Sequence, residues 1–216
     1  METSLIAAWA IAQKNGWAWG TGHIGVLRLE ATQAGWVEVE TRKGEGVTSV
    51  LRPTTRAAAW PRSISAAYGL DEQPLHVDGS HMPEPPDAVL LVSKKQNDTP
   101  TNLRRLKSPD GKTPWEVLRH GTFVVGSGPW AFLAPVLEDD KIRYDPNVME
   151  PADARAREAA AYMASLQESS EPFEWEKPDT FLLIANRSVL HGRAKVEAGD
   201  EDREVLRVAF RVGEEN

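Results

Sequence analysis

Residues 74–92 read PLHVDGSHMPEPPDAVLLV, a polar cluster followed by a short apolar run that predicts a buried strand. His76, Asp78 and His81 lie within six positions of one another in the cluster. Residues two apart in a strand or tight turn point to the same side of the backbone, so His76 and Asp78 are spaced to bind one ion together. Two imidazoles and a carboxylate make most of a metal site. The stretch therefore raises the question of which residue completes the site.

The composition restricts what this site can be. The chain has 216 residues, 41% hydrophobic and 26% charged, which suits one globular domain with a substantial core. No cysteine is present, so zinc ribbons, iron–sulfur clusters, disulfides and thiol nucleophiles are excluded, and a metal must be held by histidine, carboxylate or water. The formal net charge of −7 argues against nucleic acid or an anionic membrane as partner, since either would need a basic surface.

The N-terminal segment METSLIAAWAIAQKNG predicts an amphipathic helix that is capped by Thr3 or Ser4 and ends at Gly16. It has an acidic residue at position 2 and lacks the cationic region of a signal peptide. No segment of the sequence approaches the roughly 20 apolar residues of a membrane-spanning helix. We therefore expect a cytoplasmic protein.

Short strands dominate the rest of the expected structure. The apolar patterns predict strands over 23–31, 35–44, 87–92, 121–128, 130–138, 141–145, 179–186 and 203–212. Helices are expected over 151–167, with Pro151 in the first turn, and after a turn in 99–106. This pattern predicts a mainly β (α+β) sandwich or jelly-roll barrel with helices on its outside. We expect one domain over 1–216, with a helix and strands in 1–62 and the jelly-roll core in 63–216.

A second candidate ligand lies far along the chain, in LLIANRSVLHGRAKV, residues 182–196. An apolar strand runs into Asn186, polar residues follow, and His191 then precedes a glycine. A histidine at the end of a buried strand is well placed to face a cavity mouth. With His76 and Asp78 it would form the two-histidine, one-carboxylate face that holds non-haem Fe(II) and leaves three coordination positions open. The alternative third ligand is His81.

Two arginines follow His191. Arg203 and Arg207 lie four residues apart in REVLR, and residues four apart on a strand share one face. A buried arginine is costly unless it meets an anion, and a guanidinium grips a carboxylate in two places. The pair therefore indicates a pocket for a carboxylate. The alternative is a solvated strand edge, on which both arginines pair with neighbouring acidic residues.

In this order, the His-x-Asp motif, the VLHGR motif and the arginines of REVLR resemble those of the TauD/clavaminate-synthase-like family of Fe(II)- and 2-oxoglutarate-dependent oxygenases. The resemblance covers residues 63–105 and 175–211. It implies a double-stranded β-helix (jelly-roll, cupin-like) core with flanking helices. It also implies that iron is bound by His76, Asp78 and His191.

The resemblance further implies how a co-substrate binds. In this family 2-oxoglutarate chelates the iron through its keto and adjacent carboxylate oxygens, and an arginine and a threonine hold its far carboxylate. Arg203 matches that arginine, and Thr99 matches the threonine, with Thr101 as the alternative. Arg207 matches an arginine that meets an acidic group of the substrate in some relatives. Arg193 would support the carboxylate of 2-oxoglutarate from further away.

The leading hypothesis is therefore an Fe(II)- and 2-oxoglutarate-dependent oxygenase. It would use O₂ to oxidise a C–H bond, most often by hydroxylation, in a small molecule that bears an acidic group, such as an amino-acid-like or natural-product intermediate. Desaturation, epoxidation and ring formation need the same ligands and remain open. One alternative is a metal-dependent hydrolase built on His76, Asp78 and His81, and another is a cupin-like binding protein without turnover. The sequence determines neither the substrate nor the oligomeric state.

Overall fold

The structure is a computed structural model that describes residues 3–42, 44–59, 63–106 and 113–213. Its centre is a larger sheet with the strand order β1-β12-β4-β14-β2, in which β3 also pairs with β14. These strands are β1 (Trp17–Thr21), β2 (Val37–Val39), β3 (Thr48–Leu51), β4 (Ala88–Ser93), β12 (Thr180–Ala185) and β14 (Val205–Arg211). All the pairs are antiparallel. The strands predicted over 87–92, 179–186 and 203–212 are confirmed.

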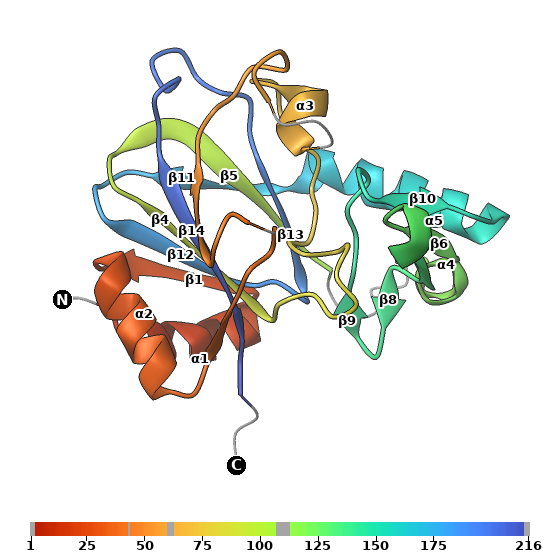
Figure 1. Ribbon diagram of the computed structural model, residues 1–216, viewed down its shortest axis with the longest axis horizontal. Helices are drawn as coiled ribbons and strands as arrows, with labels where there is room; N and C mark the ends of the chain where they lie inside the picture. Colours follow the sequence, from red (N-terminus) through yellow and green to blue (C-terminus); the bar gives the residue numbers. More distant parts are fainter. Residues whose placement is uncertain (1–2, 43, 60–62, 107–112, 214–216) are drawn as a thin grey trace.

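A smaller sheet of β11 (Glu171–Trp175), β5 (Asn97–Arg105) and β13 (Val189–Arg193) faces the larger one (Figure 1). Apolar side chains of both sheets meet between them, among them Leu91, Leu182, Leu103 and Trp175. The opposite face of the larger sheet packs against two N-terminal helices, so both faces of β4 and β12 are buried. The predicted mainly β fold with a jelly-roll core and flanking helices is confirmed.

The two N-terminal helices are α1 (Leu5–Asn15) and α2 (Ile24–Gln33). The predicted helix α1 is confirmed, and it ends at Gly16, whose φ of 103° favours glycine. The strand predicted over 23–31 is wrong, because this segment is α2. Its buried residues Leu27 and Ala31 are four apart, the helical spacing, and His23 caps its first turn through a hydrogen bond from the backbone of Gly25. The prediction failed because the short alternation of apolar and polar residues in 23–31 also fits a strand.

The helix predicted within 99–106 is also wrong, because β5 runs through this segment. Strand β5 has a partner on each side, β11 and β13, and it turns Thr99, Thr101 and Leu103 to its buried face. Pro100 lacks the N–H group that a central strand needs, and the pairing with β11 is irregular around it. Tertiary pairing overrides the local turn signal of the proline here.

The remaining elements form an insertion between β5 and β11. It contains α4 (Trp115–His120), β6 (Phe123–Val125), β7 (Phe132–Ala134), β8 (Leu137–Glu138), β9 (Lys141–Ile142), β10 (Met149–Pro151) and α5 (Ala154–Ser165), with 3-10 turns at Gly128–Trp130 and Leu166–Ser169. The predicted helix is confirmed as α5, but Pro151 ends β10, and Asp153 is the residue that caps the helix. The strands predicted over 121–145 are present in shorter form.

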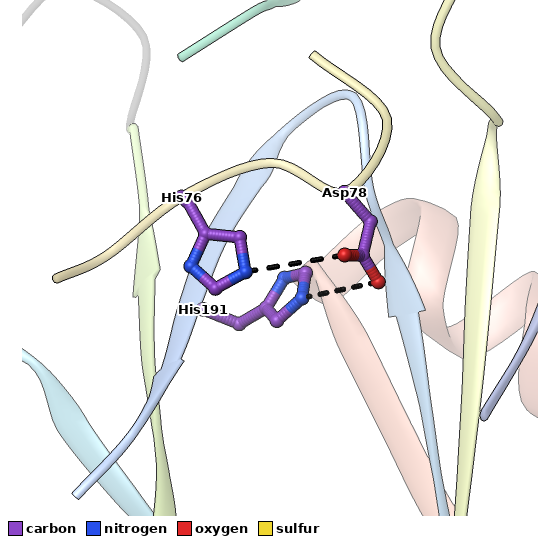
Figure 2. Close-up of side chains that lie close together, drawn as sticks. All are labelled: His76, Asp78 and His191. Carbon is purple, nitrogen blue, oxygen red and sulfur yellow. Dashed lines mark ion pairs between the residues drawn. The ribbon is translucent and has the colours of Figure 1, made fainter. Parts of the chain in front are cut away.

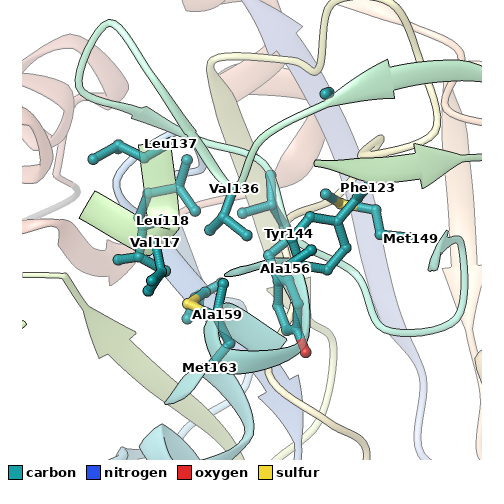
Figure 3. Packing of buried hydrophobic residues seen from close by; sticks show 14 of the residues in the cluster. Val117, Leu118, Phe123, Val136, Leu137, Tyr144, Met149, Ala156, Ala159 and Met163 are labelled. Carbon is teal, nitrogen blue, oxygen red and sulfur yellow. The ribbon is translucent and has the colours of Figure 1, made fainter. Parts of the chain in front are cut away.

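The insertion has its own apolar cluster, in which Phe123, Tyr144 and Met163 pack with residues of α4 and α5 (Figure 3). Leu75 and Val77 belong to the same cluster. Residues 75 and 77 therefore anchor this segment to the insertion, while the alternate residues 76 and 78 face the sheets. The short helix α3 (Ile64–Tyr68) precedes the segment. No helix among the described residues is long and apolar enough to cross a membrane.

Candidate metal centre

His76 and His191 lie side by side on two antiparallel stretches of backbone. Each donates its N–H to the carbonyl of the other, at 2.9 Å in both directions. Their ring centroids are 4.9 Å apart. Strand β12 ends at Ala185, and His191 lies within the next strand, β13, so the expectation that it ends the apolar strand is wrong. A turn over residues 186–188 reverses the chain and brings His191 back beside His76.

Asp78 completes the group (Figure 2). Its Oδ1 lies 3.9 Å from Nε2 of His76, and its Oδ2 lies 3.7 Å from Nε2 of His191. All three side chains are buried, and one ligand atom of each lies within 4.8 Å of the others. His81 is exposed and lies outside this group. Among the described residues, the geometry therefore favours His191 over His81 as the third ligand.

Both imidazoles can present a lone pair to a cation. His76 Nδ1 lies 2.9 Å from the carbonyl oxygen of Pro74, so this nitrogen carries the hydrogen and Nε2 is left with the lone pair. Burial lowers the pKa of His191, which keeps it neutral at physiological pH. His191 Nδ1 is buried without a hydrogen-bond partner among the described residues.

Asn186 fixes the backbone of Asp78. Its side-chain oxygen accepts a hydrogen bond from the Asp78 N–H, and its amide nitrogen donates to the Asp78 carbonyl, both at 3.0 Å. The same nitrogen donates to the carbonyl of Pro86 at 2.8 Å. Sequence reasoning recorded Asn186 only as the end of a strand. The sequence does contain a hint of this role, because an amide side chain at the end of an apolar run needs buried hydrogen-bond partners.

Asp78 is ionised in this site. Burial raises the pKa of its carboxyl group, but opposing influences, of which the charge of Arg207 is the largest, hold the pKa well below its usual range. Arg207 donates from Nη1 to Oδ1 at 3.0 Å, whereas Oδ2 is buried without a hydrogen-bond partner among the described residues. A buried carboxylate oxygen without a partner is costly. The free oxygen and two imidazole nitrogens fit a divalent transition metal such as Fe(II).

Arg203 forms a second polar site nearby. It is buried, and it donates from Nη1 to the carbonyl oxygen of Thr99 at 3.1 Å. Burial and the charge of Arg193 lower its pKa to about 10, so the guanidinium is still charged at neutral pH. No carboxylate among the described residues forms an ion pair with it. The charge of Asp200 offsets the effect of burial only in part, so a bound anion would stabilise the buried guanidinium further.

The two threonines near Arg203 have different partners. The Thr99 hydroxyl donates to Oδ2 of Asp200 at 2.6 Å and accepts from the Glu197 N–H at 3.0 Å. The Thr101 hydroxyl accepts from Nε1 of Trp175 at 3.2 Å. The hydrogen of Thr99 is therefore already donated to a carboxylate, whereas the hydroxyl of Thr101 acts as an acceptor in this contact.

Arg193 and Arg207 are both held by protein groups. Arg193 donates to the carbonyl oxygens of residues 69, 70, 71 and 194, so it fixes the segment that follows α3. Besides Asp78, Arg207 donates to the hydroxyls of Thr41 and Ser49, at 3.1 and 3.3 Å. Sequence reasoning missed Thr41 and Ser49. Their signal was weak, because single small polar residues are common, and only Thr41 lay in an expected strand.

Known structures share this architecture, although no protein-family model and no curated protein sequence matches the chain. A crystal structure of asparagine oxygenase (AsnO) aligns with a TM-score of 0.74 at 16% identity, over 96% of this chain and 77% of that one. Asparagine oxygenase in complex with Fe(II), 2S,3S-3-hydroxyasparagine and succinate gives 0.71 at 17% identity, over 95% and 77%. The non-heme iron oxygenase OrfP in complex with Fe, succinate and (3S)-hydroxy-L-Arg gives 0.71 at 15% identity, over 96% and 80%. At these identities the likeness establishes the fold, and it confirms the double-stranded β-helix that the resemblance implied.

Proposed function

We propose that this protein is an Fe(II)- and 2-oxoglutarate-dependent oxygenase that hydroxylates a small molecule. The observation that carries the proposal is the buried group of His76, Asp78 and His191, in which one carboxylate oxygen lacks a partner. The buried Arg203, which has no direct ion pair among the described residues, supports it, since the reaction needs a site for a second carboxylate. The fold is that of proteins whose structures contain Fe(II), succinate and hydroxylated asparagine or arginine.

His76, Asp78 and His191 would hold the iron on one face and leave three positions open. When bound, Fe(II) supplies the activation of O₂ that no side chain provides. Arg203 would hold the far carboxylate of 2-oxoglutarate, and a threonine of β5 would donate a hydrogen bond to it. The apolar side chains packed between the two sheets would limit the access of water to this region. Overall, 2-oxoglutarate, O₂ and R–H give succinate, CO₂ and R–OH.

We propose an amino-acid-like substrate that bears an acidic group. Arg207, which the sequence matched to a substrate-binding arginine, is held by Asp78, Thr41 and Ser49 and so does not itself support this choice. The structures of AsnO and OrfP contain 3-hydroxyasparagine and hydroxy-L-Arg, both of which carry a carboxylate. We expect a panel of free amino acids to contain a substrate that stimulates succinate formation.

The first test is spectroscopic and needs no substrate. Fe(II) and then 2-oxoglutarate are added anaerobically, and the visible charge-transfer band of the chelate is recorded. We expect the band in the wild type and in the matched control His81→Ala, and no band in His191→Ala. A band that survives in His191→Ala and is lost in His81→Ala would favour the hydrolase-type site. Absence of the band in folded, metal-loaded wild type would overturn the proposal.

A further inference from the structure

The two oxygens of Asp78 are not equivalent. Oδ1 accepts a hydrogen bond from Arg207 Nη1 at 3.0 Å, while Oδ2 is buried without a hydrogen-bond partner among the described residues. Oδ2 is also the oxygen nearer to His191, at 3.7 Å from its Nε2. A cation bound to Oδ2 would satisfy the oxygen that lacks a partner and leave the hydrogen bond to Arg207 intact.

Arg207 is fixed where it lies. It occupies the middle of β14, paired with Leu91 of β4 on one side and with Ser49 of β3 on the other. Its Nη2 donates to the hydroxyls of Thr41 and Ser49, so three side chains determine the plane of the guanidinium. A buried arginine held at three points cannot turn away from Asp78 without losing these bonds.

From this arrangement we infer that Arg207 is a positioning residue of the metal centre. By occupying Oδ1, it keeps Asp78 a monodentate ligand through Oδ2. A carboxylate that bound through both oxygens would fill one of the three positions that 2-oxoglutarate and O₂ require. This role rests on the proposed metal centre, and it is distinct from the contact with a substrate's acidic group. Thr41 and Ser49 hold the Arg207 guanidinium in place and so affect the metal centre only through Arg207.

Water bound to Mn(II) provides a test that does not depend on turnover. Mn(II) replaces Fe(II), and the water-proton relaxivity of the bound ion counts its exchangeable waters. In the wild type we expect the value for three waters, one for each open position. In Arg207→Met, Asp78 is free to bind through both oxygens, and we expect the relaxivity to fall by about one third. A wild-type value for two waters would overturn the inference without any variant.

The matched control is Arg211→Met, four residues further along β14, where the arginine is ion-paired with Glu84 and partly exposed. Its relaxivity should equal that of the wild type. Equal relaxivity in stoichiometrically loaded Arg207→Met and wild type would overturn the inference. If Arg207→Met does not fold, Arg207→Lys replaces it, because the ammonium keeps the buried charge but cannot reach Asp78, Thr41 and Ser49 together. Arg207→Lys should also lower the relaxivity, and an unchanged relaxivity in this variant would overturn the inference.

The proposed function is tested by a different measurement. It would be wrong if the Fe(II)-loaded protein formed no 2-oxoglutarate chelate, whatever the relaxivity shows. If instead the chelate band forms and the relaxivity of Arg207→Met is unchanged, the oxygenase proposal stands and the positioning role is overturned.

Discussion

Arg203 and Arg207 lie four residues apart and are equally buried, each 7% exposed, yet their surroundings differ. Arg207 donates to a carboxylate and two hydroxyls. Arg203 donates to one backbone carbonyl and has no ion-pair partner among the described residues. Burial, the largest influence, lowers the pKa of Arg203, and the charge of Asp200 offsets this only in part.

The difference indicates that Arg203, rather than Arg207, is available to bind a ligand. A buried cation whose bonds are satisfied within the protein belongs to the architecture, and its removal damages the fold. A buried cation without a direct ion pair gains when an anion binds. The two arginines should therefore respond differently to the same substitution.

The largest expected difference is in stability. Arg207→Met should lower the free energy of unfolding of the metal-free protein by roughly 3–5 kcal/mol, because it leaves the buried carboxylate of Asp78 without its cation. Arg203→Met should lower it less, because Arg203 forms no direct ion pair whose carboxylate would be left buried and alone. Urea unfolding of both variants measures this. If Arg203→Met lowered the free energy of unfolding as much as Arg207→Met does, the proposed difference between the two arginines would be wrong.

The next effect is on 2-oxoglutarate. Arg203→Met should weaken its binding to the Fe(II)-loaded protein by roughly 1.5–3 kcal/mol, or about 10- to 150-fold, since a charge-assisted hydrogen bond is lost. Anaerobic titration of the charge-transfer band gives the dissociation constant. Arg52→Met is the control, because Arg52 forms an exposed ion pair with Glu204 next to Arg203. If Arg203→Met binds 2-oxoglutarate as the wild type does, Arg203 is not its anchor.

The smallest effect distinguishes the two threonines near Arg203. Thr101→Val should weaken 2-oxoglutarate binding by roughly 0.5–1.5 kcal/mol, the usual worth of one hydrogen bond. Thr99→Val should have less effect, because the Thr99 hydroxyl already donates its hydrogen to Asp200. The same titration measures both. If Thr99→Val had the larger effect, the Thr99 hydroxyl would donate to 2-oxoglutarate instead of to Asp200.

Much of the fold followed from the sequence because apolar runs in β4, β12 and β14 fit a doubly covered sheet. The errors at α2 and β5 have a common cause. Residues 23–31 and 99–106 are short, and their state depends on packing against distant segments rather than on their own pattern.

The candidate ligands were also visible, because their spacing is local at His76 and Asp78 and the VLHGR motif is specific. The environment of the arginines was not. Spacing puts Arg203 and Arg207 on one face, but only the fold brings Thr41, Ser49 and Asp78 to one of them. Asn186 was missed as a positioning residue for the same reason.

The backbone pairing of His76 with His191 has a consequence for protein synthesis. The two ligands are separated by 115 positions (191 − 76), so at roughly 5–20 residues per second the ribosome makes the second about 6 to 23 s after the first. During this interval the nascent chain holds His76 and Asp78 without their partner strand. The group of His76, Asp78 and His191 can therefore form only after β13 has been made, late in the synthesis of the chain.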